Sequence, residues 1–300
     1  MDNLKIPKLK MTISMLIFST IGIFVRSISL PSGIIAAFRG LIGALFLFFL
    51  TIILKKRISF KAVKANFTIL LFSGTAIGIN WMLLFESYKH TTVAKATLCY
   101  YLAPVFFVII SSFFLNEKMT VKKLLCTITA LFGMILISGV TDTGFNKNIF
   151  IKGDWKGIIL AVSAAVFYAI VMVLNKKIHD IGSFDKTIVQ LITAAIIILP
   201  YSLAAETLRL TSINPKLIIL TAVVGILHTG VAYTLYFSAV KELPAQSTAI
   251  LSYIDPAVAV LLSVLLLNET MKPLSFVGGL MILSAAMISE LTSKTKDLQK

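Results

Sequence analysis

The sequence predicts an all-α polytopic membrane protein with ten transmembrane helices, arranged as two inverted-topology five-helix repeats. Three observations lead to this fold class: an apolar composition, a series of apolar segments of helix length, and a pattern that recurs at a fixed distance along the chain. Of the 300 residues, 58% are hydrophobic and only 14% are charged, and the mean hydropathy is +0.94. A soluble domain carries about 25% charged residues. Too little polar surface is present to cover a water-soluble body, so lipid is the expected solvent.

Ten apolar segments have the length of a membrane-spanning helix, which is about 20 residues for a hydrocarbon core of about 30 Å. Backbone groups in lipid must be paired internally, so a span is either a helix or part of a closed barrel. The segments show no strict alternation of apolar and polar residues, which argues against a barrel. The ten predicted helices cover residues 11–29, 34–54, 67–88, 93–115, 121–140, 156–174, 186–205, 216–239, 245–267 and 273–291.

One stretch of the first half recurs in the second half. Residues 94–117 form an apolar run with Pro104 in its middle and an Asn-Glu pair at its end, and residues 246–269 repeat this pattern 152 positions later. An offset close to half of the chain predicts two copies of one unit, residues 1–145 and residues 146–300. Each copy has an odd number of spans, so the second enters the membrane from the opposite side, a topology common among secondary transporters. The matching pairs are Tyr101 and Tyr253, Pro104 and Pro256, Asn116 and Asn268, and Glu117 and Glu269.

The distribution of basic residues predicts the orientation. With the N-terminus in the cytoplasm, the cytoplasmic regions hold 18 Lys and Arg residues and the opposite side holds 9. Because Lys and Arg concentrate on the cytoplasmic side, we expect a multi-pass protein of the cytoplasmic membrane with both termini in the cytoplasm. The first apolar run lacks a small-residue cleavage site and is expected to remain as a span. The net charge of +15 lies in short clusters between spans, so nucleic acid is not an expected partner.

Further matches flank the duplicated run. Gly78 to Trp81 (GINW) aligns with Gly230 to Tyr233 (GVAY), again 152 positions apart, and Arg39 lies early in the second predicted span. With the paired proline and Asn-Glu motifs, these residues make the chain resemble the EamA branch of the drug/metabolite transporter superfamily over essentially its whole length. The resemblance implies a ten-helix bundle with a central substrate cavity that works by alternating access. Many members of this family export amino acids or related compounds.

One position departs from the family pattern. Members usually have a glycine nine residues after the motif glutamate, and Gly278 fits, whereas the first half has Cys126. Gly133 is expected to supply the close helix packing there. Cys126 and Cys99 both lie in apolar runs without metal-ligand or redox spacing, so we expect them to be small buried hydrophobes.

The paired motifs are expected to shape the scaffold. Pro104 and Pro256 each remove a backbone hydrogen bond and should bend their helices. Glu117 and Glu269 fall at helix ends, where a carboxylate can reach water or cap the next helix. The small-xxx-small pair in Gly74–Gly78 is typical of close helix packing in membranes.

Asp255 is the clearest candidate for contact with a substrate. It lies near the middle of the predicted span 245–267, and an ionisable residue at that depth is costly enough to be a functional hypothesis by default. Thr248, Ser252 and Asp255 recur at helical spacing and form one polar face. The carboxylate either serves as a counter-charge for a substrate amine or a proton site, or it bonds to backbone that the proline kink frees. Both interpretations stay open at this point.

The other candidates also lie within apolar spans. Arg39 could bind a carboxylate group bidentately or pair with a neighbouring helix. His228 is either a proton or substrate site or a hydrogen-bonded packing residue. Tyr101 and Tyr253 lie too deep to be interface anchors, so they line a cavity or pack between helices. The candidate substrate-binding residues are Asp255, Tyr253, Tyr101, Trp81, Asn80, Tyr233, His228, Tyr168, Arg39 and Ser252.

These observations favour a secondary transporter of a small metabolite, with efflux of amino acids or related compounds as the leading hypothesis. Import by the same fold, lipid flipping and a scaffold role are the alternatives. An enzyme is not expected, because the sequence has no H-E-x-x-H, G-x-S-x-G or phosphate-binding loop, and neither a metal nor a cofactor is predicted. The expected partners are a small-molecule substrate and membrane lipid, with protons as a candidate coupling ion. The sequence does not distinguish a monomer from a homodimer.

Overall fold

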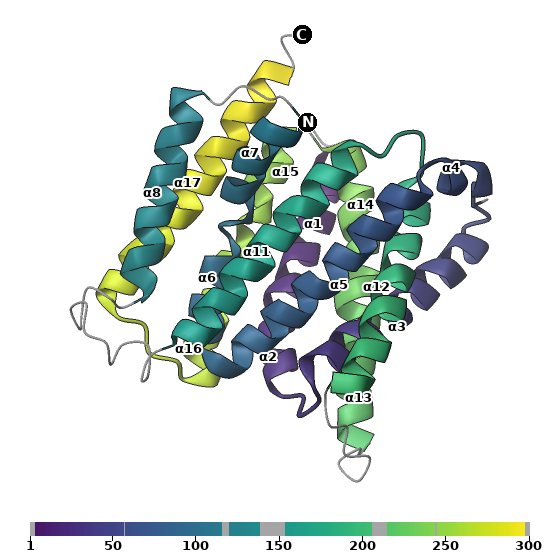
Figure 1. Ribbon diagram of the computed structural model, residues 1–300, viewed down its shortest axis with the longest axis horizontal. Helices are drawn as coiled ribbons and strands as arrows, with labels where there is room; N and C mark the ends of the chain where they lie inside the picture. Colours follow the sequence, from purple (N-terminus) through teal and green to yellow (C-terminus); the bar gives the residue numbers. More distant parts are fainter. Residues whose placement is uncertain are drawn as a thin grey trace.

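The computed structural model describes residues 4–56, 58–115, 120–138, 154–205, 215–243 and 245–297. In these ranges the chain is helical and contains no strand (Figure 1). Each of the ten predicted segments forms helix over most of its described residues, which confirms an all-α protein. Eight helical spans are long and apolar enough to cross a membrane, and α8 and α17 occupy the other two predicted segments. The count of ten transmembrane helices and their inverted repeat remain predictions.

The helices of the first half are α1 (Lys5–Ser19), α2 (Ile21–Arg26), α3 (Ser32–Ile53), α4 (Phe60–Ala65), α5 (Phe67–His90), α6 (Val93–Tyr100), α7 (Ala103–Phe114) and α8 (Val121–Ser138). Those of the second half are α11 (Trp155–Lys176), α12 (Ser183–Ala205), α13 (Pro215–Gly225), the π-helix η3 (Ile226–Val231), α14 (Ala232–Glu242), α15 (Ala245–Ser252), α16 (Ile254–Leu267) and α17 (Pro273–Asp297). Four of the predicted spans are therefore built from consecutive helices that meet at a break or a π-turn.

Two of these breaks occur at the paired prolines. In the first half α6 ends at Tyr100 and α7 starts at Ala103, with Pro104 in its first turn. In the second half α15 ends at Ser252 and α16 starts at Ile254, with Pro256 in its first turn. Proline has no N–H to donate to the preceding turn and is best tolerated at the start of a helix. The sequence predicts bends here, and the structure goes further by ending one helix and starting another.

The two halves pack against each other along most of their length. Helix α5 packs on α11 and α12, α3 packs on α12, α1 packs on α14, and α8 packs on α17. A Cβ added at Gly74 would lie 2.6 Å from Thr193 Cβ, so α5 approaches α12 as closely as a small residue allows. A Cβ at Gly133 would lie 2.6 Å from the carbonyl oxygen of Gly278, so these glycines let α8 and α17 touch through their backbones. The expected packing roles of Gly74 and Gly133 are thereby confirmed.

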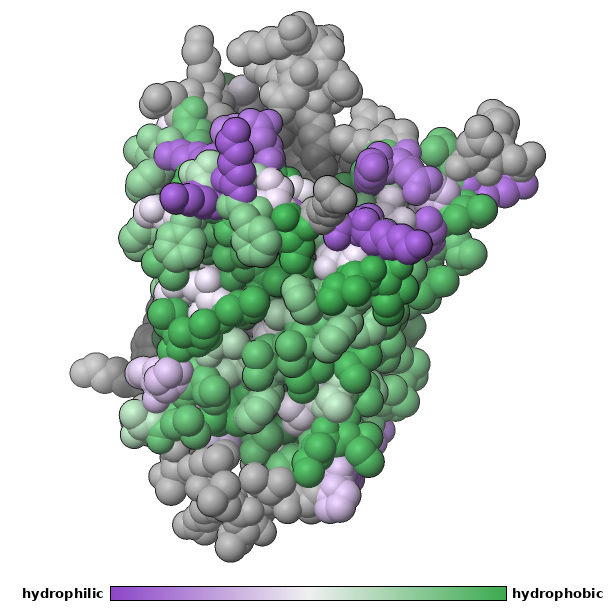
Figure 2. All heavy atoms as spheres, turned by 90° about the vertical axis from the view of Figure 1, so that its right-hand side faces the viewer, coloured by the Kyte–Doolittle hydropathy of each residue, from purple (hydrophilic) through white to green (hydrophobic). Residues whose placement is uncertain are grey.

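The outer surface has the character of a lipid-facing bundle. Figure 2 shows a broad apolar surface, with hydrophilic residues gathered toward one end. That end carries the loop after α3 and the short helix α4, whose Lys55, Lys56, Lys61 and Lys64 are exposed. Helix α1 begins and α17 ends at the same end of the bundle (Figure 1). This arrangement agrees with an even number of crossings, whereas the assignment of this end to the cytoplasm stays a prediction.

Candidate functional site

A cavity of about 300 Å³ lies inside the bundle and is lined from both halves of the chain. Helices α1, α2, α3, α5, α6 and α7 contribute from the first half, and α11, α14, α15 and α16 contribute from the second. Its lining is mostly aromatic and aliphatic, with few charged groups. This is the composition of a small-molecule site, in which an apolar wall buries the ligand and a small number of polar groups orient it.

The two helix breaks meet at this cavity. Tyr101 occupies the first break and Tyr253 the second, and their ring centroids lie 6.1 Å apart at an angle of 49°. Asp255 follows the second break and lies in the first turn of α16, where the positive end of the helix dipole stabilises a carboxylate. The broken helices thus bring a charged group and two phenols together at the contact between the halves, in the manner of transporters that bind substrate on discontinuous helices.

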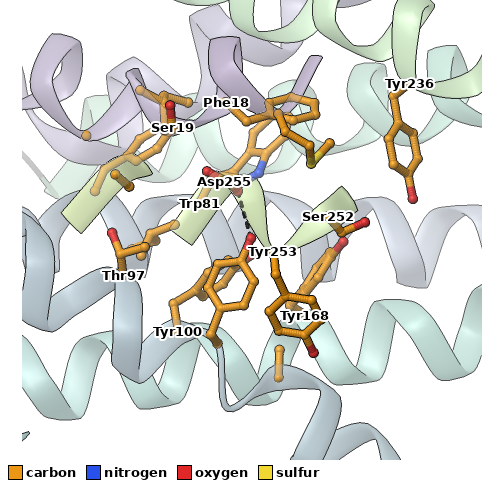
Figure 3. A pocket seen from close by; sticks show the side chains of 18 of the residues that line it. Phe18, Ser19, Trp81, Thr97, Tyr100, Tyr168, Tyr236, Ser252, Tyr253 and Asp255 are labelled. Carbon is orange, nitrogen blue, oxygen red and sulfur yellow. Dashed lines mark hydrogen bonds between the residues drawn. The ribbon is translucent and has the colours of Figure 1, made fainter. Parts of the chain in front are cut away.

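The Asp255 carboxylate has a side-chain partner. Its Oδ2 accepts a hydrogen bond of 2.8 Å from the hydroxyl of Tyr101, drawn as a dashed line in Figure 3. Asp255 is partly exposed and lines the cavity. Of the two interpretations left open by the sequence, bonding to backbone freed by the kink is not what the structure shows, because in the described residues the carboxylate is held by a tyrosine from the other half.

Arg39 supplies the opposite charge in the same cavity. Only 4% of this residue is exposed, and its guanidinium carbon lies 3.9 Å from the ring centroid of Trp81. Its Nε donates a hydrogen bond of 2.8 Å to Oγ1 of Thr229 in the π-helix η3. No carboxylate of the described residues lies within ion-pair distance of it. A buried cation is costly without an anionic partner, so Arg39 offers an anchoring point for an anionic group.

Most of the remaining predicted residues also line the cavity. Trp81, Tyr168, Tyr233 and Ser252 are part of its wall, and several of them are labelled in Figure 3. The ring of Tyr168 lies beside that of Tyr100 with centroids 5.6 Å apart, and ring contacts continue from Tyr100 through Tyr101 to Tyr253.

Two predicted residues lie elsewhere. Asn80 is buried between helices, where its amide donates to the carbonyl of Ala164 at 2.6 Å and its oxygen faces the hydroxyl of Tyr100. His228 is fully buried, and its Nε2 lies 2.9 Å from Oγ1 of Thr20. Neither residue lines the cavity, so both serve to hold helices together. For His228, this position favours a hydrogen-bonded packing residue over a proton or substrate site.

Several wall residues are not among those predicted from the sequence. Tyr88, Thr97, Tyr100 and Tyr236 all line the cavity. Thr97 precedes Tyr101 by four positions, and Tyr236 follows the predicted Tyr233 by three, so helical spacing alone could have identified both of them. In the described part of the chain, no three His, Cys, Asp or Glu side chains gather as they would around a metal ion.

Comparison with known proteins gives related sequences over the same regions. The model of the EamA-like transporter family matches residues 8–139 and 155–290. The uncharacterized transporter YxxF of Bacillus subtilis (strain 168) is 35% identical over 254 residues, which cover 85% of this chain and 79% of YxxF. The threonine/homoserine exporter RhtA of Escherichia coli (strain K12) is 29% identical over 151 residues, about half of either chain.

The fold also has a counterpart among solved proteins. One crystal structure superposes with a TM-score of 0.65 over 96% of this chain and 98% of its own, at 17% sequence identity. At this level of identity the similarity concerns the fold alone.

Proposed function

Because the chain belongs to the EamA-like transporter family, we propose that it is a secondary transporter that moves a small metabolite across the cytoplasmic membrane by alternating access. Efflux of amino acids or related compounds is the activity that we favour. In this proposal the two halves, residues 1–145 and residues 146–300, are inverted repeats. The match of one family model to two segments of the chain supports this division.

The observation that carries the proposal is a pair of opposite charges in one small cavity. Asp255 accepts a hydrogen bond from a neutral tyrosine, and Arg39 has no carboxylate partner in the described residues. We assign the ammonium group of the substrate to Asp255 and its carboxylate group to Arg39. Aromatic rings favour the approach of a cation, so Tyr101 and Tyr253 support the amine end. The relationship to the threonine/homoserine exporter RhtA agrees with a substrate of this kind.

The size of the cavity also favours a small metabolite. About 300 Å³ is at the lower end of the range for small-molecule pockets, and the polar groups face inward from both halves. A lipid-flipping protein would instead need a polar path that opens sideways to the bilayer. Protons remain a candidate coupling ion, with Asp255 as the group that would carry them. The residues proposed to contact substrate are Asp255, Tyr253, Tyr101, Trp81, Tyr233, Tyr168, Arg39 and Ser252.

A thermal-shift panel on the detergent-purified protein tests the proposal. Each amino acid is compared with its methyl ester, its decarboxylated amine and its α-hydroxy acid, alongside sugars, nucleosides and dispersed lipid. A ligand at about 100 times its dissociation constant stabilises the folded protein by about 2.7 kcal/mol. We expect the intact amino acids to raise the melting temperature most, and Asp255→Asn to reduce this rise.

The matched control is Asp185→Asn, because Asp185 accepts a hydrogen bond from the backbone of Ser59 away from the cavity. A shift with lipid and with no soluble compound would refute the metabolite proposal. A shift with sugars or nucleosides alone would refute the amino-acid assignment. Flux measured in proteoliposomes with the gradient set in either direction then distinguishes efflux from import.

A further inference from the structure

The short helix α6 is tied to α16 at both of its ends. At its N-terminus the Glu269 carboxylate, just after α16, accepts hydrogen bonds from the backbone N–H groups of Val93 at 2.9 Å and Ala94 at 3.3 Å. At its C-terminus Tyr101 donates to Asp255 in the first turn of α16 at 2.8 Å. Because α6 is a separate helix that ends at a break, these ties can hold it as one unit against α16.

The backbone around Glu269 orients its carboxylate toward α6. Asn268 adopts a left-handed conformation (φ 51°) that ends α16, and the next N–H, that of Glu269, bonds back to the carbonyl of Ser263. This turn aims the carboxylate at the first N–H groups of α6, which have no partner within their own helix. Only 6% of the Glu269 side chain is exposed, and Arg26 at the end of α2 forms an ion pair with it. Glu269 thus joins α2, α6 and α16 at one end of the bundle.

The cavity is sealed at this same end. A Cβ added at Gly22 would lie 2.5 Å from Val93 Cγ1, so α2 and α6 are in direct contact. The wall residues next to this contact, Tyr88 and Thr97, are 3% and 6% exposed. Tyr168, beyond the midpoint of α11 toward the other end, is 41% exposed. The cavity is therefore closed where Glu269 holds α6.

We propose that Glu269 is a positioning residue of the transport cycle, which holds α6 against α16 and keeps this end of the cavity closed. The end opens when α6 leaves α16, which requires both ties to break. Building on the function proposed above, a substrate ammonium group that binds Asp255 replaces the Tyr101 hydroxyl and removes one of the ties. Substrate binding at the helix crossing is in this way coupled to the closure formed by Glu269.

Other polar contacts at this end are weaker constraints on α6. Lys95 of α6 forms an ion pair with Asp154 before α11, and both side chains are partly exposed. Exposed ion pairs contribute little. Glu86 at the end of α5 is bonded to Ser32, Lys89 and His90, none of which belongs to α6. Glu86 therefore provides a matched control, since it is a carboxylate at the same end with several partners and without a bond to α6.

The test measures access to the closed end by cysteine labelling in membrane vesicles. Cys99 and Cys126 are replaced by alanine, and Thr97→Cys serves as the reporter, with Met172→Cys on α11 as a second reporter in the cavity wall. A membrane-impermeant maleimide is added to one side at a time, and Thr270→Cys, exposed next to Glu269, identifies the side that carries the closure. The variants are Glu269→Ala, the isosteric Glu269→Gln, Arg26→Gln, Tyr101→Phe and Glu86→Gln.

We expect Glu269→Ala to raise the labelling rate of Thr97→Cys from the Glu269 side by about tenfold or more, because it removes two charge-assisted hydrogen bonds. Glu269→Gln keeps one acceptor and should give a smaller rise in the labelling rate. Arg26→Gln removes a half-exposed ion pair and should raise the rate less than about fivefold. Tyr101→Phe should also raise the rate, multiplying the effect of Glu269→Gln. Glu86→Gln should leave the rate unchanged.

Unchanged labelling in both Glu269 variants would overturn the proposal. An equal rise in the labelling rate with Glu86→Gln would overturn it too. So would an equal rise in the labelling rate of Met172→Cys accompanied by a lower melting temperature. Either result would indicate that the whole bundle is less tightly packed. No change with Tyr101→Phe would refute the second tie. The labelling needs no substrate, so it can fail while the thermal-shift panel identifies a ligand, and it can succeed when the panel identifies none.

Discussion

The most direct prediction concerns the change Asp255→Asn. The substitution keeps the size of the side chain, and the amide oxygen can still accept the hydrogen bond that Tyr101 donates at 2.8 Å. The contact between the broken helices should therefore persist, while the charge that faces the cavity is lost. The variant tests the assigned role of the carboxylate with little change to the fold.

The magnitude follows from the kind of bond that is lost. A hydrogen bond to a charged group contributes about 1.5–3 kcal/mol, which corresponds to an increase in Kd of about 10- to 150-fold. Asp255 is partly exposed to the cavity, so water weakens the interaction and we expect the lower part of this range. The loss should be confined to ligands that carry an amine.

The assay measures equilibrium binding of a radiolabelled amino acid and of its α-hydroxy acid, each to the original protein and to Asp255→Asn. The four dissociation constants form a double-mutant cycle in which one of the two changes is made in the ligand. We expect the substitution to weaken the amino acid about tenfold or more and to leave the hydroxy acid unaffected. An equal loss for both ligands would show that Asp255 acts on the shape of the site. Full affinity for the amino acid would refute the assignment of the ammonium group to Asp255.

Three further predictions concern other parts of the molecule. Arg39→Lys should lower affinity for amino acids about tenfold but leave affinity for their methyl esters unchanged in the same binding assay, because an ammonium group cannot replace a planar, stacked guanidinium. Tyr253→Ala should abolish flux in proteoliposomes while gel filtration shows a folded protein, and full flux would remove Tyr253 from the mechanism. Gly133→Ala should destabilise the protein by about 1–3 kcal/mol, because the new Cβ would lie 2.6 Å from a backbone oxygen of Gly278. Gly182→Ala, whose Cβ would meet nothing closer than 3.7 Å, is the control in the same thermal denaturation experiment.

Two kinds of feature could be predicted from the sequence, and both follow from local constraints. Lipid requires about 20 apolar residues for each crossing helix, so the positions of the helices follow from hydropathy. The recurrence at 152 positions predicted paired prolines with the same effect on their helices, and the structure has a helix break at each. A charged residue within such a segment is conspicuous, and for this reason Asp255 and Arg39 could be identified as candidates before the cavity was known.

The direction in which a side chain points was decided by the tertiary structure. Asn80 and Trp81 are neighbours in the sequence, yet Trp81 lines the cavity and Asn80 bonds to the backbone of α11. His228 resembles a mid-span functional residue in the sequence, and the fold buries it between helices. Helical periodicity relates residues within one helix, whereas the face that meets the cavity depends on the packing of all neighbouring helices.

Glu269 gives the clearest contrast. The sequence placed it at a helix end, where its carboxylate can reach water or cap the next helix. In the structure it caps α6, 176 residues earlier in the sequence. A carboxylate at a helix end needs a hydrogen-bond donor, and this requirement follows from the sequence. Only the packing of α16 beside α6 determines which N–H groups meet it, because that contact joins the two halves of the chain.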